Sequence, residues 1–274
     1  MEKFNMQRFG WLLRQTVHHQ SKSLLMTALG CVLLHLGAQC GSFYPFSFTP
    51  SATPEATERV AMDQSSVFFL LASVFFMFWC ISLCGYHLKD KPGRIAALML
   101  PATVQEKYAA QLLIFTVGAF VANLLGIVVA DLLRIVLFSL QPQAYGTALP
   151  ALVDFCGRIW AQFWTDVTQG SLPEMRGLFM FLPLAKGFCL YAIFLLGAVI
   201  FRRRAFAITL CILVAFTVVV SMMLSSHFMA HEHDSVNPVS VCLTLLFYLL
   251  SGVGLVALSY ALFKRVTLVR RKWF

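Results

Sequence analysis

Charged side chains are scarce in this sequence, because lysine, arginine, aspartate and glutamate together make up only 12% of its 274 residues. Soluble domains carry about 25% charged residues and are roughly half apolar, whereas this chain is 59% apolar. So few charges do not coat a water-soluble globule, and the composition also excludes disordered and collagen-like chains. With its long apolar runs, the sequence predicts an all-α integral membrane protein, since a helix satisfies its own backbone hydrogen bonds in hydrocarbon.

Several motifs of known chemistry are also absent. No G-x-x-x-x-G-K-[ST] phosphate loop occurs, so any nucleotide hydrolysis must come from another polypeptide. There is no G-x-S-x-G nucleophile elbow and no H-E-x-x-H zinc motif. The eight cysteines lack the paired C-x-x-C spacing of zinc and redox sites. We therefore expect neither an enzyme nor a cofactor bound by this chain.

Six stretches are long and apolar enough to be helices that cross a bilayer, which takes about 20 residues each. They cover residues 24–43, 66–86, 108–130, 178–201, 206–226 and 239–263. The third would be able to run on to Leu140, which would place Asp131 and Arg134, one helical turn apart, at the outer interface or pair them there. The chain thus divides into an amino-terminal segment, 1–23, and a six-span transmembrane domain, 24–274.

The basic residues are sorted between the two sides of this predicted arrangement. All lysines and arginines fall on one side except Arg59, Arg134, Arg158, Arg176 and Lys186. Basic loops stay in the cytoplasm, so both termini are expected there, and the net charge of +9 needs no nucleic-acid partner. We expect the first span to be retained, because Gln39 stands where a signal cleavage site requires a small residue.

Two further segments have the pattern of amphipathic helices lying in the membrane interface. Residues 4–19 place apolar positions at spacings of three and four opposite Arg8 and Arg14, which predicts a helix at the inner surface. Residues 149–168 place Asp154 and Arg158 opposite an apolar face, which predicts an outer helix with Trp160 and Trp164 at headgroup level.

The cytoplasmic loop 87–107 carries the clearest local signals. Pro92-Gly93 predicts a turn, residues 95–100 form a short apolar segment, and Thr103 with Glu106 makes the S/T-x-x-E capping box that begins a helix. On residue chemistry alone, an ordinary interhelical loop with a good cap is the simpler interpretation.

The same loop resembles a known family. Met99-Leu-Pro-Ala-Thr-Val-Gln-Glu-Lys-Tyr108 resembles the LPAS..EK segment of type 2 ATP-binding cassette (ABC) transporter permeases, and Ala130-Asp-Leu-Leu-Arg134 is similar to the segment after their third span. The resemblance implies that the loop docks in a groove of a separate cytoplasmic ATPase subunit. The contact candidates that it implies are Leu98, Leu100, Pro101, Thr103, Glu106 and Lys107.

The resemblance further implies the membrane subunit of an ABC exporter in the bacterial inner (cytoplasmic) membrane, moving an amphipathic or lipid-like substrate. A second permease half, identical or paralogous, would complete it, and ATP and Mg would bind on the partner ATPase. This sequence departs from the family in a short loop at 226–238 and a long loop between the third and fourth spans. A membrane interaction or immunity-type protein, acting without transport, is the alternative.

Polar groups within the predicted spans are candidates for a substrate path. Lys186, His35 and Asn123 lie there, and a lysine near the bilayer centre costs about 2.5 to 3.5 kcal/mol on insertion scales. Lys186 would face the bundle, snorkel to the interface or pair with a carboxylate such as Asp131. For His35 and Asn123, packing or an interhelical hydrogen bond is the simpler role.

One cluster has the residue types of a metal site. His227, His231 and His233, with two neighbouring carboxylates, would be able to hold zinc or copper. Short outer loops often collect polar residues, however, and no further ligand is fixed by spacing. A metal-handling protein or small membrane enzyme centred on these histidines is therefore a third and weaker hypothesis.

Overall fold

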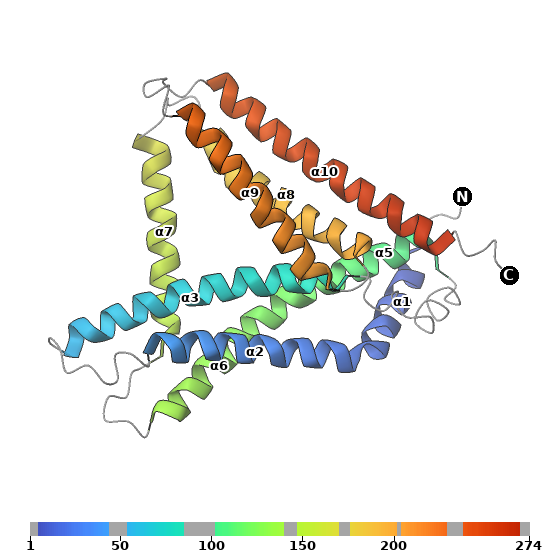
Figure 1. The fold of residues 1–274 in the computed structure, drawn as a ribbon. Helices are drawn as coiled ribbons and strands as arrows, with labels where there is room; N and C mark the ends of the chain where they lie inside the picture. The colour runs from blue at the N-terminus through green and yellow to red at the C-terminus, as the bar shows by residue number, and fades with distance from the viewer. Residues whose placement is uncertain are drawn as a thin grey trace. The chain divides into compact units, whose positions relative to one another are not determined.

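The structure is a computed structural model that describes residues 5–43, 54–84, 102–139, 147–169, 176–201, 204–228 and 238–268. Within these ranges all regular secondary structure is helical, as Figure 1 shows. The elements are α1 (Met6–His19), α2 (Ser21–Phe43), α3 (Pro54–Ser82), α5 (Val104–Leu113), η3 (Ile114–Gly118), α6 (Ala119–Phe138), α7 (Leu149–Gln169), α8 (Arg176–Ile200), α9 (Ala205–Phe228) and α10 (Pro238–Leu268). The prediction of an all-α chain is confirmed for the described residues.

Five helical segments of the described chain are long and apolar enough to cross a membrane. They are Ser21–Ser42, Val60–Ser82, Val104–Phe138, Phe181–Ile200 and Cys242–Arg265. A shorter apolar stretch, Ala205–Val218, lies in α9. Multiple apolar helices of this kind indicate a multi-pass membrane protein. A sixth crossing and the orientation of the termini stay predictions.

Two helices extend beyond the predicted spans. Helix α3 begins at Pro54 rather than at residue 66, because proline at a first helical position loses no hydrogen bond and polar residues such as Asp63 are tolerated where a helix continues past the apolar run. The third span likewise runs from Val104 to Phe138 through the π-helical turn η3, in line with the predicted extension toward Leu140. The length of the apolar run alone therefore underestimates how long both helices are.

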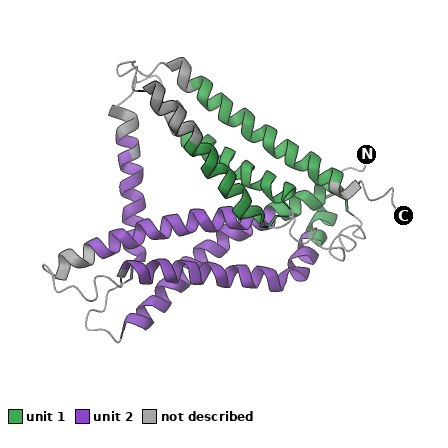
Figure 2. Ribbon diagram, viewed as in Figure 1, with its two compact units in different colours: residues 1–12, 81–112, 166–274 green, residues 13–80, 113–165 purple. Residues whose placement is uncertain are grey.

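The described chain forms two compact units, coloured separately in Figure 2. Unit 1 contains residues 1–12, 81–112 and 166–274, and unit 2 contains residues 13–80 and 113–165. Each has its own interior, and the two interiors are described separately.

The interior of unit 2 is formed by α2, α3, α6 and the beginning of α7. Phe69 is fully buried and packs with Ala61, Ile127 and Phe138 in one cluster. Cys31, Phe76, Cys80 and Ala119 form a second cluster. Helices α2 and α6 approach closely at Gly126, where a Cβ atom would lie 2.6 Å from the Cys31 sulfur. A side chain at this glycine would push the two helices apart.

The interior of unit 1 is formed by α5, α8, α9 and α10. Close helix contacts here also depend on glycine. A Cβ at Gly197 of α8 would lie 2.0 Å from Thr209 Oγ1 of α9, and one at Gly252 of α10 would lie 2.6 Å from the Phe188 ring of α8. The Cys189 sulfur of α8 lies 3.5 Å from the Ser251 hydroxyl of α10. Small residues thus let these backbones approach, as in other membrane helix pairs.

Helix α7 matches the amphipathic helix predicted at 149–168. Its first turn packs on unit 2 through Ala148, Leu149 and Leu152. Further along, Trp160 and Trp164 are exposed, and Arg158 forms an exposed ion pair with Asp63 of α3. The helix is confirmed, and its position in a membrane interface stays a prediction.

Candidate functional site

Glu106 joins the beginnings of two helices in unit 1. The predicted capping box of α5 is confirmed: Glu106 Oε2 accepts a hydrogen bond from the Thr103 amide at 2.8 Å, and Thr103 Oγ1 accepts one from the Glu106 amide at 3.2 Å. The other carboxylate oxygen, Oε1, accepts a hydrogen bond from the Asn5 amide at 2.9 Å. The two backbone amides that this carboxylate binds therefore come from the starts of two different helices.

Asn5 is itself the N-cap of α1. Its carbonyl accepts the first helical hydrogen bond, from Phe9, and its side-chain oxygen accepts a hydrogen bond from the Gln7 amide at 2.9 Å. Helix N-termini carry partial positive charge, so one carboxylate at the start of both α1 and α5 is stabilised by both. Arg8 adds an ion-pair contact at 3.7 Å to a Glu106 side chain that is fully buried.

The predicted docking residues are only partly within the described chain. Thr103 and Glu106 form the cap, and Lys107 lies directly behind it at the start of α5, half-buried. Leu98, Leu100 and Pro101 lie outside the described residues. The contribution of Asn5 and Arg8 was not predicted, although Asn5 stands immediately before an amphipathic helix, which is the usual place of an N-cap.

A polar stripe runs along the buried face of α2 in unit 2. Cys31, His35, Gln39 and Ser42 recur at spacings of three and four, and all four are fully buried. Leu25, Met26, Leu29 and Leu33, on other faces of the same helix, are exposed. A helix that turns its polar side chains inward and its leucines outward has the arrangement expected in lipid.

Two residues of this stripe, Cys31 and His35, join α2 to α6. The Nε2 atom of His35 lies 3.0 Å from Oδ1 of Asn123, so an interhelical hydrogen bond, one of the two roles that the sequence left open for each side chain, joins them to each other. The Cys31 sulfur lies 3.7 Å from the carbonyl oxygen of Ala122. The His35 ring also packs against Phe69 of α3, with ring centroids 5.8 Å apart. Three helices therefore meet around one imidazole.

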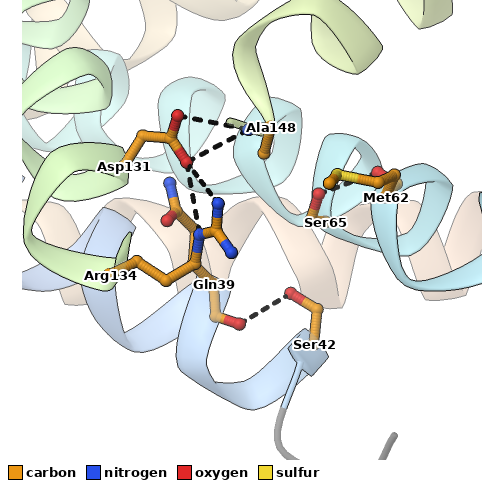
Figure 3. Close-up of polar contacts among 7 residues, drawn as sticks. All are labelled: Gln39, Ser42, Met62, Ser65, Asp131, Arg134 and Ala148. Atoms are coloured by element: carbon orange, nitrogen blue, oxygen red, sulfur yellow. Dashed lines mark hydrogen bonds and ion pairs between the residues drawn. The ribbon is translucent and has the colours of Figure 1, made fainter. Parts of the chain in front are cut away.

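A second group of buried polar side chains in unit 2 is an ion pair on α6, drawn in Figure 3. The Arg134 guanidinium donates to Asp131 Oδ1 from Nε at 3.2 Å and from Nη2 at 3.0 Å, and both side chains are essentially inaccessible to solvent. Of the two alternatives that their spacing left open, a position at the outer interface or a pairing there, the described residues show the pairing. The backbone amide of Ala148 donates to the same carboxylate, at 3.3 and 3.2 Å from its two oxygens.

Asp131 therefore supports the beginning of α7. Ala148 is the N-cap residue of that helix, because its carbonyl accepts the first helical hydrogen bond from Leu152. An alanine side chain offers no oxygen to the amides of the first turn, and the one amide at this helix start that is shown bonded to Asp131 is that of Ala148 itself. Pro150 removes one further amide from the same turn.

Gln39, labelled in Figure 3, belongs to the buried polar face of α2. Its side chain is fully buried, and neither amide atom has a hydrogen-bond partner among the described residues. Its carbonyl oxygen accepts a hydrogen bond from the Ser42 hydroxyl at 3.1 Å. The sequence indicated Gln39 only as an unsuitable cleavage residue, although its spacing from His35 was the signal that it belongs to the same face.

Lys186, the remaining candidate for a substrate path, belongs to unit 1. It is exposed on α8, and its Nζ atom lies 5.8 Å from the centre of the Tyr248 ring of α10, within the range of a cation–π contact. His35, Asn123 and Asp131 belong instead to the polar stripe region of unit 2. The four predicted residues thus divide into three buried residues of unit 2, of which His35 and Asn123 bond to each other, and one exposed lysine of unit 1.

No metal site is found in the described part of the chain, where no three His, Cys, Asp or Glu side chains gather closely enough to hold an ion. This finding does not cover the three candidate histidines. His231 and His233 lie outside the described residues, as does the side chain of His227.

Comparison with known proteins returned no match. No protein-family model, no curated protein and no solved structure matches this chain.

Proposed function

We propose that this chain is the membrane subunit of an ABC transporter, an exporter of an amphipathic or lipid-like substrate driven by separate ATPase subunits. The observation that carries the proposal is the Glu106 carboxylate, which binds the residue before α5 and the N-cap of α1 together. Helix α5 directly follows the loop that resembles the docking segment of type 2 permeases. The start of α5 and the amino-terminal helix would therefore move together when an ATPase pushes on either.

The membrane character of the chain supports the same proposal. Five apolar helical segments, with α9 as a sixth, fit a six-span half, and the basic residues favour a cytoplasmic location for both termini and loop 87–107. The chain has no phosphate loop of its own, so ATP and Mg would be bound by the partner. A second permease half would complete the translocation path.

The proposal is tested first by binding. An ATPase with a phosphate loop, encoded beside this chain, is co-expressed and co-purified with the full-length protein in detergent. Replacing Leu98 and Leu100 by Asp should abolish co-purification, because it places two charges in an apolar contact. The matched control is Val153→Asp on α7, at a position that is 69% exposed and predicted to lie outside. Retained binding in the double variant would contradict the proposed dock.

A second variant tests the role of Glu106. Glu106→Gln keeps the shape of the side chain but removes the charge that binds two helix starts, so ATPase binding should weaken while the protein still elutes as a folded species. Topology gives an independent check, because a cysteine introduced at position 102 should resist membrane-impermeant thiol reagents in intact cells. Labelling of that cysteine from outside would reject a cytoplasmic loop and with it the proposed function.

One observation favours the alternative of a non-transporting interaction or immunity-type protein. Helix α7 is held at its start by Asp131 yet exposes Val153, Trp160 and Trp164. An exposed aromatic face on a fixed helix is suited to contact another membrane protein. Under this alternative, Trp160→Ala with Trp164→Ala would abolish activity in cells, while the Leu98 and Leu100 variants would leave it unchanged.

A further inference from the structure

Unit 1 contains an open groove of about 410 Å³ formed by α5, α8 and α10. This volume lies within the range of small-molecule sites, roughly 300 to 1,000 Å³. Gln105 lies at the start of α5, and every other lining residue is apolar or aromatic. These are Tyr108, Phe188, Val253, Val256, Ala257 and Tyr260. The groove is therefore suited to a hydrocarbon chain.

The aromatic walls of the groove are held in place by specific contacts. The Tyr108 hydroxyl lies 2.6 Å from the Ser259 hydroxyl, and the Tyr108 ring meets the Tyr260 ring edge to face at 5.4 Å. The Phe188 ring, which also lines the groove, lies directly over Gly252, where the absence of a side chain makes room for it. A pre-formed slot of this kind loses little conformational entropy when a chain enters.

Positive charge lies at one end of the groove. Val253, Val256, Ala257, Tyr260 and Lys264 recur on α10 at spacings of three and four, so Lys264 continues the lining face by one turn. Lys264 is exposed, Arg265 follows it, and no acidic residue lines the groove. The apolar run of α10 ends at Phe263, so Lys264 and Arg265 are its first charged residues, which are expected at the level where headgroups begin. A chain lying in the groove would thus bring its headgroup to a cationic site.

We propose that this groove binds an acyl chain of an anionic phospholipid, with the phosphate at Lys264. The apolar wall alone does not distinguish one lipid tail from another, because the surrounding bilayer is equally apolar. Selectivity comes from the headgroup, and one lysine near the surface gives about a fivefold preference for an anionic lipid. The site does not depend on the ATPase partner proposed above.

The test uses the full-length chain in nanodiscs of phosphatidylcholine that contain a trace of photoreactive lipid. The probe carries a diazirine on its acyl chain and is either phosphatidylglycerol or phosphatidylcholine. After illumination, labelled peptides are identified by mass spectrometry. We expect peptides containing residues 105–108 and 253–260 to be labelled about fivefold more by phosphatidylglycerol. Equal labelling by the two probes would reduce the groove to ordinary lipid contact and overturn the proposal.

Two variants separate the chain from the headgroup. Ala257→Trp fills the groove and should remove its labelling by both probes, whereas Leu258→Trp, at an exposed neighbouring position that does not line the groove, should keep it. Lys264→Glu changes only the cationic end, so labelling by phosphatidylglycerol should fall to the level of phosphatidylcholine. Unchanged labelling in Ala257→Trp, or an unchanged preference in Lys264→Glu, would each contradict the site. Because Lys264 is exposed, its variant remains informative if the tryptophan disturbs folding.

Discussion

Apart from the Glu106 carboxylate that joins α1 and α5, the two units hold their helices together with different kinds of side chain. In unit 2, α2, α3 and α6 surround a fully buried histidine, glutamine and ion pair. In unit 1, α8, α9 and α10 meet over glycines, and the stacked rings of Phe194 and Phe206, 5.6 Å apart, lie between α8 and α9. In lipid, apolar packing costs nothing in desolvation, whereas each buried polar group must be paired. Unit 2 therefore carries polar groups that packing alone does not require.

This contrast makes unit 2 the more sensitive to single substitutions that remove polarity. Unit 1 should instead be sensitive to added volume at more of its helix contacts, because a Cβ would clash at both Gly197 and Gly252, whereas the described part of unit 2 has one such glycine, Gly126. Four sets of substitutions test this difference, with stability measured as thermal or denaturant unfolding of the purified protein in detergent.

The largest effect is expected at the buried ion pair. Asp131→Ala leaves the Arg134 charge buried and removes the acceptor of the Ala148 amide, so stability should fall by roughly 3 to 5 kcal/mol. Combining Asp131→Leu with Arg134→Met should recover much of the loss, since an apolar pair needs no partner. Asp154→Ala, an exposed position on α7, is the control. An Asp131→Ala protein as stable as this control would show that the pair does not hold unit 2 together.

Added volume in unit 1 should have the next largest effect. Gly197→Ala places a methyl group 2.0 Å from Thr209 Oγ1, a buried hydroxyl that is already held by its hydrogen bond to the Ala205 carbonyl. Overpacking of this kind costs about 1 to 3 kcal/mol. Adding Thr209→Ala should restore part of the stability, and Gly187→Ala, with nothing within 4 Å, should be close to neutral. Equal behaviour of the two glycine variants would refute the close-packing account.

One interhelical hydrogen bond in each unit gives a smaller and more direct comparison. Tyr108→Phe should cost about 0.6 kcal/mol, because Ser259 keeps its hydrogen bond to the Val256 carbonyl. His35→Leu should cost more, up to about 1.7 kcal/mol, because it leaves Asn123 buried without this partner. If the tyrosine variant is the less stable of the two, the proposed difference between the units is wrong.

The exposed ion pair between Arg158 and Asp63 should have the smallest effect. The hydrogen bond from Arg158 to Asp63 holds the pKa of the guanidinium above its usual value, but both side chains are largely open to solvent. Arg158→Ala should leave the unfolding midpoint unchanged within error at physiological salt, since exposed pairs contribute little. A clear loss of stability would mean that α7 depends on this pair as well as on Asp131.

Sequence patterns located the helices well because apolar length is a local property. Segment 178–201 was predicted and α8 covers Arg176–Ile200, while the capping box at Thr103 and Glu106 follows from a fixed spacing of three. The early start of α3 was missed, because helix can continue through polar residues once its apolar part is anchored. Local patterns thus predict the elements and, less reliably, their ends.

The partners of the buried polar groups were harder to predict, because they depend on which helices meet. The spacing of Asp131 and Arg134 indicated their pairing, but nothing local showed that the same carboxylate binds Ala148. Likewise the sequence marked Glu106 as a cap of α5, whereas its bond to Asn5 joins residues 101 positions apart. Lys186, for which Asp131 was a candidate partner, lies over the Tyr248 ring. The partner of a buried polar side chain depends on which helices pack together, and residue spacing within one helix does not predict that packing.

The bond between Asp131 of α6 and the amide of Ala148 affects whether α7 would keep its N-terminus when it is removed from this protein. Its starting point is specified by a carboxylate that the chain supplies from α6, not by the residue at its own N-cap. A synthetic peptide of residues 147–169, or a graft of this segment onto another scaffold, would carry the amphipathic pattern but not the boundary, and its first turn would fray. A graft that keeps the start of this helix would therefore have to transfer α6 and α7 together.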